Sequence, residues 1–176
     1  LILALALLMS TGLAFQSFAQ GCTDLFFSEY VEGSSGNNKC VEIYNPTGAA
    51  IDLSAGAYKV QVFANGAAMA GSTIALTGTI AAYGTYVLCN SGAGTGLLAV
   101  ANQTSGSLSH NGDDALALVK GAGNTFVDIF GNIGNDPGAA WTSGAISTVD
   151  QVLRRKSAVQ AGITINPGGT GAGAFA

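Results

Sequence analysis

The 176-residue sequence predicts an all-β domain folded as an antiparallel β-sandwich, and three observations support this prediction. Only 9% of the residues are charged, against roughly 25% in an average soluble domain, and 26 glycines take up much of the difference. Apolar and polar residues alternate with a period of two in several short runs. Turn-forming Gly, Pro, Asn and Asp separate these runs, and no stretch has the pattern of an amphipathic helix.

The alternating runs define about seven to nine short strands. In the first, Leu25–Glu32, strict alternation places Phe27 and Tyr30 on opposite faces of the sheet. The Gly-rich turn after Lys120 predicts a hairpin between the two runs that flank it, and Leu97–Ala101 fits either a short strand or one helical turn. The other runs expected to be extended are Cys40–Tyr44, Ile51–Ser54, Tyr58–Phe63, Thr73–Ile80, Thr85–Cys89, Ala115–Lys120, Thr125–Phe130 and Val152–Lys156.

The first 20 residues have the pattern of a signal peptide. Leu1–Leu8 is an unbroken apolar run, and Ser17-Phe18-Ala19 places small residues where a signal peptidase reads them, so cleavage is expected after Ala19 or Gln20. The apolar run is shorter than the ~20 residues that a bilayer core requires. The sequence therefore predicts export to the extracellular space or cell surface and no transmembrane anchor.

Both ends of the sequence indicate a fragment of a longer protein. The sequence begins with Leu rather than Met, and residues 161–176 form a Gly-rich end that composition predicts to be a flexible tail or linker. The mature domain is expected to span residues 21–160.

Three cysteines, Cys22, Cys40 and Cys89, would meet an oxidising compartment after export. One disulfide with one remaining thiol is compatible with this number, and so is the absence of any disulfide. The spacing of the cysteines neither selects a pair nor resembles a zinc site.

The charge distribution argues against a general nucleic-acid binder. The net charge is -4, whereas such proteins carry a basic face that releases counterions from phosphates. Half of the six basic residues nevertheless fall together, at Arg154, Arg155 and Lys156. Alternation places Arg154 and Lys156 on one face and Arg155 on the other. This group is either a small contact site for an anion or polynucleotide, or a solvated strand end that protects a sheet edge.

The sequence offers little for catalysis. Its single histidine, His110, is either a general base near Asp113 or Asp114 or a loop histidine that hydrogen-bonds locally. No nucleophile motif accompanies it, which favours the second interpretation. We therefore assign no catalytic residue and no cofactor, and expect a protein that is not an enzyme.

Four carboxylates in or near polar loops, Glu29, Glu32, Asp113 and Asp114, are the candidates for calcium binding, because calcium prefers oxygen ligands from loops. Their spacing matches no calcium-loop motif, and Asp113 could equally cap its turn. No metal site is assigned from this pattern.

Three further residues have two interpretations each. Glu42 and Asp128 alternate with apolar residues inside strands, so we expect them to face solvent or to pair with a lysine across the sheet. Trp141 is either a binding aromatic on a loop or a core residue, and the core is favoured for a single tryptophan.

Several segments together resemble the bacterial lamin tail domain family. Leu25–Ser54 (LFFSEYVEGSSGNNKCVEIYNPTGAAIDLS) resembles the opening of that domain, and Leu108–Lys120 (LSHNGDDALALVK) resembles its central hairpin. Val127–Trp141 (VDIFGNIGNDPGAAW) and the run Asp150–Ser157 resemble its later part. The resemblance extends from about Leu25 to Val159, which is most of the mature chain.

The resemblance implies an immunoglobulin-like β-sandwich that acts as a non-catalytic interaction module of an exported bacterial protein, for binding, adhesion or scaffolding. Its partner would be a protein, a polysaccharide or a nucleic acid. An alternative implied by the resemblance is an accessory domain of a secreted nuclease or phosphoesterase whose catalytic domain lies outside this fragment. Family members usually continue with a further segment that supplies a closing strand.

Overall fold

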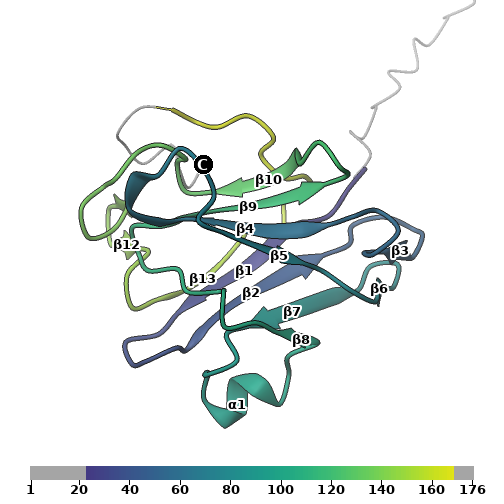
Figure 1. The fold of residues 1–176 in the computed structure, drawn as a ribbon, viewed down its shortest axis with the longest axis horizontal. Coiled ribbons are helices and arrows are strands. Elements are labelled where there is room, and N and C mark those ends of the chain that lie inside the picture. Colours follow the sequence, from purple (N-terminus) through teal and green to yellow (C-terminus); the bar gives the residue numbers. More distant parts are fainter. Residues whose placement is uncertain (1–22, 169–176) are drawn as a thin grey trace, which may run out of the picture.

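The computed structural model describes residues 23–168, in which two β-sheets pack face to face (Figure 1). The predicted signal peptide and residues 169–176 lie outside the described residues. Of the thirteen described strands, five form one sheet, in the order β13-β1-β2-β7-β8. Their bounds are β13 Val152–Arg154, β1 Phe26–Glu32, β2 Lys39–Tyr44, β7 Thr85–Cys89 and β8 Gln103–Thr104. All neighbours in this sheet are antiparallel except the β7–β8 pair.

The second sheet has four antiparallel strands in the order β10-β9-β4-β5. Their bounds are β10 Thr125–Phe130, β9 Ala115–Lys120, β4 Lys59–Phe63 and β5 Ser72–Ala75. The remaining elements are short: β3 Ile51–Asp52, β6 Thr79–Ile80, β11 Thr142–Ser143, β12 Ile146–Ser147, the helical turn α1 Thr95–Leu98 and the 3-10 turn η1 Ala64–Gly66. This architecture confirms the predicted antiparallel sandwich.

Most predicted strands are present, with two informative differences. The expected run Thr73–Ile80 is divided into β5 and β6, because Gly78 between them adopts a left-handed φ of 88°. The ambiguous segment Leu97–Ala101 contributes to the helical turn α1. The predicted hairpin is confirmed as β9–β10. Within residues 23–168 no helix is long and apolar enough to cross a bilayer.

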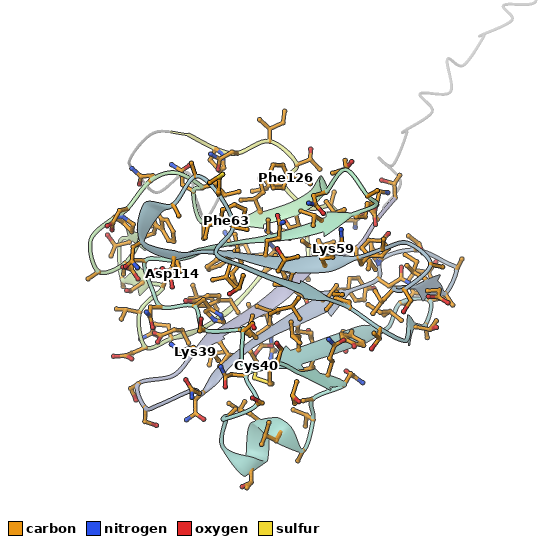
Figure 2. All side chains as sticks on the ribbon, viewed as in Figure 1. Lys39, Cys40, Lys59, Phe63, Asp114 and Phe126 are labelled. Carbon is orange, nitrogen blue, oxygen red and sulfur yellow. A yellow bond between two sulfur atoms is a disulfide. The ribbon has the colours of Figure 1, made fainter. Side chains whose placement is uncertain are left out.

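The core has two layers, one on each face of the four-stranded sheet (Figure 2). The main layer fills the space between the sheets and includes Leu116 and Leu118 of β9. The alternate residues of the same strand, Ala117 and Val119, pack in a smaller layer that Trp141 helps to form. Because β9 is buried on both faces, it lacks the apolar–polar alternation of a half-exposed strand.

Each of the two larger sheets contains a β-bulge that changes the direction of the following side chains. In β1 the register shifts between Phe27 and Glu29, and in β10 it shifts between Phe126 and Asp128. Phe27 and Tyr30 therefore both lie in the main core, and the prediction that they face opposite sides was wrong. An extra residue in a strand inverts the faces of everything beyond it, which alternation within one sequence does not reveal.

One disulfide lies within the five-stranded sheet. Cys40 of β2 stands opposite Cys89 of β7, and their sulfur atoms are bonded. Both cysteines are buried, and Cys22 lies outside the described residues. The register of β2 against β7 therefore identifies the disulfide-bonded pair of cysteines, which the sequence alone did not.

A glycine that faces Trp141 provides a test of the smaller core layer. Gly131 has φ +83°, and a Cβ built there would lie 2.8 Å from two atoms of the Trp141 ring. We expect Gly131→Ala to lower the free energy of unfolding by about 2–3 kcal/mol, since the backbone strain and the overpacking add. Gly134 has nearly the same φ, +84°, with nothing within 4 Å, so Gly134→Ala should lose only about 1 kcal/mol. Equal losses in urea unfolding would contradict tight packing of Trp141.

Candidate binding groove

A groove of about 290 Å³ lies where the edge of one sheet meets the edge of the other. One wall comes from β1 and β13, and another comes from the end of β10. The chain after β13 completes it. The lining residues are Phe27, Ser28, Glu29, Tyr30, Phe130, Ile146, Leu153, Arg154, Arg155, Lys156, Val159 and Ile163.

The lining of the groove is mainly apolar and includes a stacked aromatic pair. The rings of Tyr30 and Phe130 lie 4.3 Å apart at an interplanar angle of 14°. The Tyr30 hydroxyl donates a hydrogen bond to the Asn111 carbonyl at 3.2 Å. Burial raises the pKa of Tyr30, with smaller contributions from Glu32, Asp114 and Asp113, so the phenol stays neutral. The stack is therefore a rigid, uncharged part of the groove wall, in which Phe130 is half-buried and Tyr30 is buried.

Arg155 forms an ion pair that joins the two sheets. Its guanidinium binds both oxygens of Asp128 on β10, at 2.7 and 2.9 Å, and lies over the ring of Phe26 at 5.7 Å from the ring centroid. The Asp128 side chain is completely buried. Burial raises the pKa of Asp128, and Arg155 opposes this shift. A bidentate pair of this kind fixes the position of the chain just after β13 relative to β10.

The burial of Asp128 corrects the expectation that it faces solvent or pairs with a lysine. The extra residue at the bulge, Val127, places Asp128 opposite Leu118 and so turns the carboxylate inward. There it also accepts hydrogen bonds from the backbone N–H groups of Phe27 and Ile163, both at 2.8 Å. These partners are distant in sequence from Asp128, and no local motif indicates them.

The other two basic residues lie on the solvent side of the groove. Arg154 pairs with Glu29 on the neighbouring strand at 2.9 Å, and its side chain is 77% exposed. Lys156 is exposed, and it forms no ion pair with another residue in the range 23–168. The exposure pattern follows the predicted alternation, with Arg155 turned inward and its two neighbours outward. The structure brings all three predicted residues to one groove, and their contact with an anion remains a prediction.

The segment after the groove is held against the four-stranded sheet. Asn166 exchanges two hydrogen bonds with the backbone of Ile133, at 2.8 and 2.9 Å, and Ile163 binds Asp128. A Cβ at Gly162 would lie 2.3 Å from the Val127 carbonyl oxygen, so only glycine fits at this approach. Residues 162–166 therefore make specific contacts that their composition did not indicate, and the flexibility of the Gly-rich end stays a prediction.

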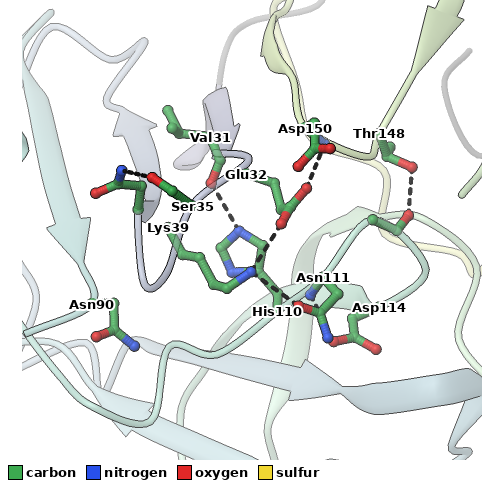
Figure 3. A network of polar contacts seen from close by, with 12 residues as sticks. Val31, Glu32, Ser35, Lys39, Asn90, His110, Asn111, Asp114, Thr148 and Asp150 are labelled. Atoms are coloured by element: carbon green, nitrogen blue, oxygen red, sulfur yellow. Dashed lines mark hydrogen bonds and ion pairs between the residues drawn. The ribbon is translucent and has the colours of Figure 1, made fainter. Parts of the chain in front are cut away.

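His110 is buried in a polar cluster at one end of the sandwich (Figure 3). Its Nε2 lies 3.1 Å from the Val31 carbonyl oxygen, so this nitrogen carries the proton, and its ring lies 4.9 Å from that of Tyr30. His110 is therefore a hydrogen-bonded residue rather than a general base. Its hydrogen-bond partner is 79 residues away in the sequence, however, and not in the same loop as expected. A fully enclosed ring cannot reach a substrate, so the arrangement does not provide a general base.

Burial of His110 predicts a defined pH dependence of stability. Desolvation lowers its pKa from 6.5 to about 4, and the charge of Lys39 acts in the same direction. The unfolded chain binds a proton between these two values and the folded chain does not, so stability falls as the pH decreases from 6.5 to about 4. The loss should be roughly 3 kcal/mol at about 1.4 kcal/mol per pH unit.

Urea unfolding between pH 7.5 and 4 measures this dependence. The comparison is with His110→Gln, which retains a donor for the Val31 carbonyl but does not titrate in this range. The chain has a single histidine, so the difference between the two pH profiles isolates this group. Parallel profiles would show that His110 is accessible and titrates normally.

The four carboxylates considered for calcium are not gathered into one site. Glu29 binds Arg154, and Glu32 binds Lys39 at 3.0 Å. Asp114 accepts hydrogen bonds from the backbone of Asn65 and Asn111, both at 2.8 Å, and Asp113 is half-buried. Among residues 23–168 no group of three or more metal-ligating side chains lies together.

The structure also tests the two interpretations that the sequence allowed for Trp141 and for Glu42. Trp141 is buried in the smaller core layer, as favoured by the sequence. Glu42 is half-buried and accepts a hydrogen bond from the Ser28 hydroxyl at 2.7 Å, so its partner is a serine rather than the expected lysine. Neither residue lines the groove.

The fold and its site define an immunoglobulin-like β-sandwich with a groove at the edges of its two main sheets. The family model of the Lamin Tail Domain matches residues 19–134, which is most of the chain. This chain therefore belongs to the lamin tail domain family, a family of non-enzymatic immunoglobulin-like domains. Comparison with curated proteins and with solved structures gives no match.

Proposed function

We propose that this domain is a non-catalytic binding module and that the groove between the sheet edges is its binding surface. The observation that carries this proposal is the combination of an apolar, aromatic lining with Arg154, Arg155 and Lys156 at its border. Apolar concave surfaces with a few convergent charged groups are typical ligand sites. Family membership supports a non-enzymatic role for the domain.

The local excess of positive charge at the groove favours an anionic ligand. The three cations outnumber Glu29 and Asp128, the two carboxylates that they contact, in a chain whose overall charge is -4. A ligand that carries both a carboxylate, sulfate or phosphate group and an apolar portion would match the border and the lining together. Acidic peptides, acidic polysaccharides and nucleic acids each supply the anion.

Binding of the full chain to an acidic peptide, heparin and single-stranded DNA tests this proposal by calorimetry at two salt concentrations. We expect one of these probes to bind, and Lys156→Glu to weaken its binding by about tenfold, the effect of roughly 1.4 kcal/mol. Lys59→Glu is the matched control, because Lys59 is a lysine outside the groove. Binding that both variants weaken equally, or that Leu153→Asp in the groove leaves unchanged, would contradict the assignment.

We also propose that the domain is exported and functions outside the cell or on its surface. The apolar run Leu1–Leu8 supports this, as does the Cys40–Cys89 disulfide, because disulfides persist in oxidising compartments. N-terminal sequencing of the protein recovered from the medium or cell surface should begin at Gln20 or Gly21. Recovery of the chain only in the cytoplasm, with residues 1–20 retained, would contradict this proposal.

The basic border also favours a second proposal, in which the domain accompanies a nuclease or phosphoesterase on the same polypeptide. Phosphodiester substrates are anionic, so a basic groove would hold them near a linked catalytic domain. The full-length reading frame tests this: a domain with metal-binding carboxylates and histidines supports it, and the absence of any hydrolase domain rejects it.

A further inference from the structure

The polar cluster around His110 contains a buried lysine that contacts an amide and a carboxylate at the same time. Lys39 begins β2, and its side chain is only 7% exposed. Its Nζ lies 3.0 Å from Glu32 Oε1 and 3.0 Å from Asn111 Oδ1 (Figure 3). Glu32 stands directly opposite Lys39 on β1, whereas Asn111 belongs to the loop that leads into β9 of the other sheet. These three side chains therefore connect the two sheets.

The neighbouring residues hold the amide and the carboxylate in position. The Asn111 backbone is fixed at both ends, because its N–H donates to Asp114 and its carbonyl accepts from the Tyr30 hydroxyl. The second oxygen of Glu32 accepts a hydrogen bond from the Asp150 backbone N–H. Since a carbonyl bond is about 1.2 Å long, Nζ lies within about 4 Å of the Asn111 amide carbon, close to the 3–3.5 Å of a reactive approach.

We propose that Lys39 and Asn111 form an intramolecular isopeptide bond, with Glu32 carrying the proton. Lys39 Nζ transfers a proton to Glu32, and the neutral amine attacks the Asn111 amide carbon to form the new C–N bond. Glu32 returns the proton to Nδ2, the original C–N bond breaks, and ammonia leaves. The attacking nitrogen then loses its second proton, which the departing ammonia takes up to become ammonium. The protonated lysine and the amide thus become a secondary amide and ammonium, with no oxidant, reductant or further reactant.

The three groups have the roles that this reaction requires. A primary amine is a nucleophile only after it loses a proton, and an adjacent carboxylate is the general base that takes it. The Lys39 and Glu32 side chains are shielded from water, whereas Asn111 reaches the surface, where ammonia can leave. The bond would connect two residues that are 72 positions apart and lie in different layers of the sandwich.

A second lysine and asparagine provide an internal comparison. Lys59 Nζ lies 2.7 Å from Asn124 Oδ1, closer than the proposed pair, but this contact is exposed. No carboxylate within residues 23–168 forms an ion pair with Lys59. If a carboxylate and burial are required, this second pair stays unlinked.

Mass spectrometry of the purified full chain, after reduction of the disulfide, tests the proposal. We expect the protein to be lighter by one ammonia, about 17 Da, than its sequence requires. Digestion should give a branched peptide that joins residue 39 to residue 111. Ammonia loss at an N-terminal Gln20 or as a succinimide at Asn111-Gly112 gives the same mass, but neither produces this branched peptide.

Three variants separate the linkage from other effects. Lys39→Arg and Glu32→Gln should abolish the branched peptide, whereas Lys59→Arg should leave it unchanged. The peptide map of the natural sequence decides the question even if a variant fails to fold. An unmodified Lys39 with an intact Asn111 amide would overturn the proposal, and so would a succinimide at Asn111. A link between Lys59 and Asn124 would overturn the role proposed for Glu32, because that pair has no carboxylate partner among residues 23–168.

Discussion

Replacing Arg155 by methionine is expected to lower the free energy of unfolding by about 3–5 kcal/mol, because it leaves the buried Asp128 carboxylate without its counter-charge. Methionine retains most of the apolar contact of the arginine stem, so the loss reports on charge rather than on volume. Asp128 would also lose both of its side-chain hydrogen bonds to the guanidinium. Urea unfolding at pH 7 measures the change.

Arg154→Met is the matched control for this experiment. Arg154 is the adjacent arginine and also pairs with a carboxylate, but it is largely exposed, so its loss should cost less than about 1 kcal/mol. Adding Asp128→Asn to Arg155→Met should restore part of the stability, since it removes the unpaired charge. Losses of similar size in the two arginine variants would show that burial does not distinguish the two ion pairs.

Removing the disulfide is expected to cost about 4 kcal/mol, from the entropy of a loop closed between positions 49 residues apart. The double variant Cys40→Ala/Cys89→Ala avoids leaving a single free thiol in the sheet. Its stability is compared with that of the natural sequence, with and without reductant, in urea unfolding.

The same experiment contains its own control. Reductant should destabilise the natural chain by a similar amount and leave the double variant unchanged. A chain whose unfolding midpoint is insensitive to reductant would indicate that Cys40 and Cys89 are not bonded in the folded protein.

The sequence predicted the strands best where one face of a strand is buried and the turns carry their own signals. The β9–β10 hairpin is an example, since the Gly-rich turn between Lys120 and Thr125 separates two apolar runs. The sandwich follows from many such segments without helices between them. Two-residue strands such as β11 and β12 are too short for any periodicity and were not predicted.

The side-chain directions of Tyr30 and Asp128 could not be predicted, because each follows a β-bulge. The site depends on these two positions: Tyr30 forms the aromatic stack, and Asp128 holds Arg155. Bulges are set by the partner strand, so they depend on contacts between residues that are distant in the sequence.

The basic residues of the groove were predicted as a group, but their partners were not. Clustering of Arg154, Arg155 and Lys156 is visible in the sequence. Pairing of Arg154 with Glu29 requires knowledge that β13 lies beside β1, and pairing of Arg155 with Asp128 requires knowledge that β10 of the other sheet lies close by. The contacts of Lys39 with Glu32 and Asn111 depend on the fold in the same way.

The place of β13 at the edge of the first sheet has a consequence for how the protein is made. The pair Glu29 and Arg154 spans 125 positions, so β1 leaves the ribosome long before its outer neighbour exists. At about 5–20 residues per second, the 125 positions take about 6–25 seconds to synthesise, and β1 has one edge open during this time. A nascent chain in this state cannot complete its five-stranded sheet before residues 152–154 have been synthesised.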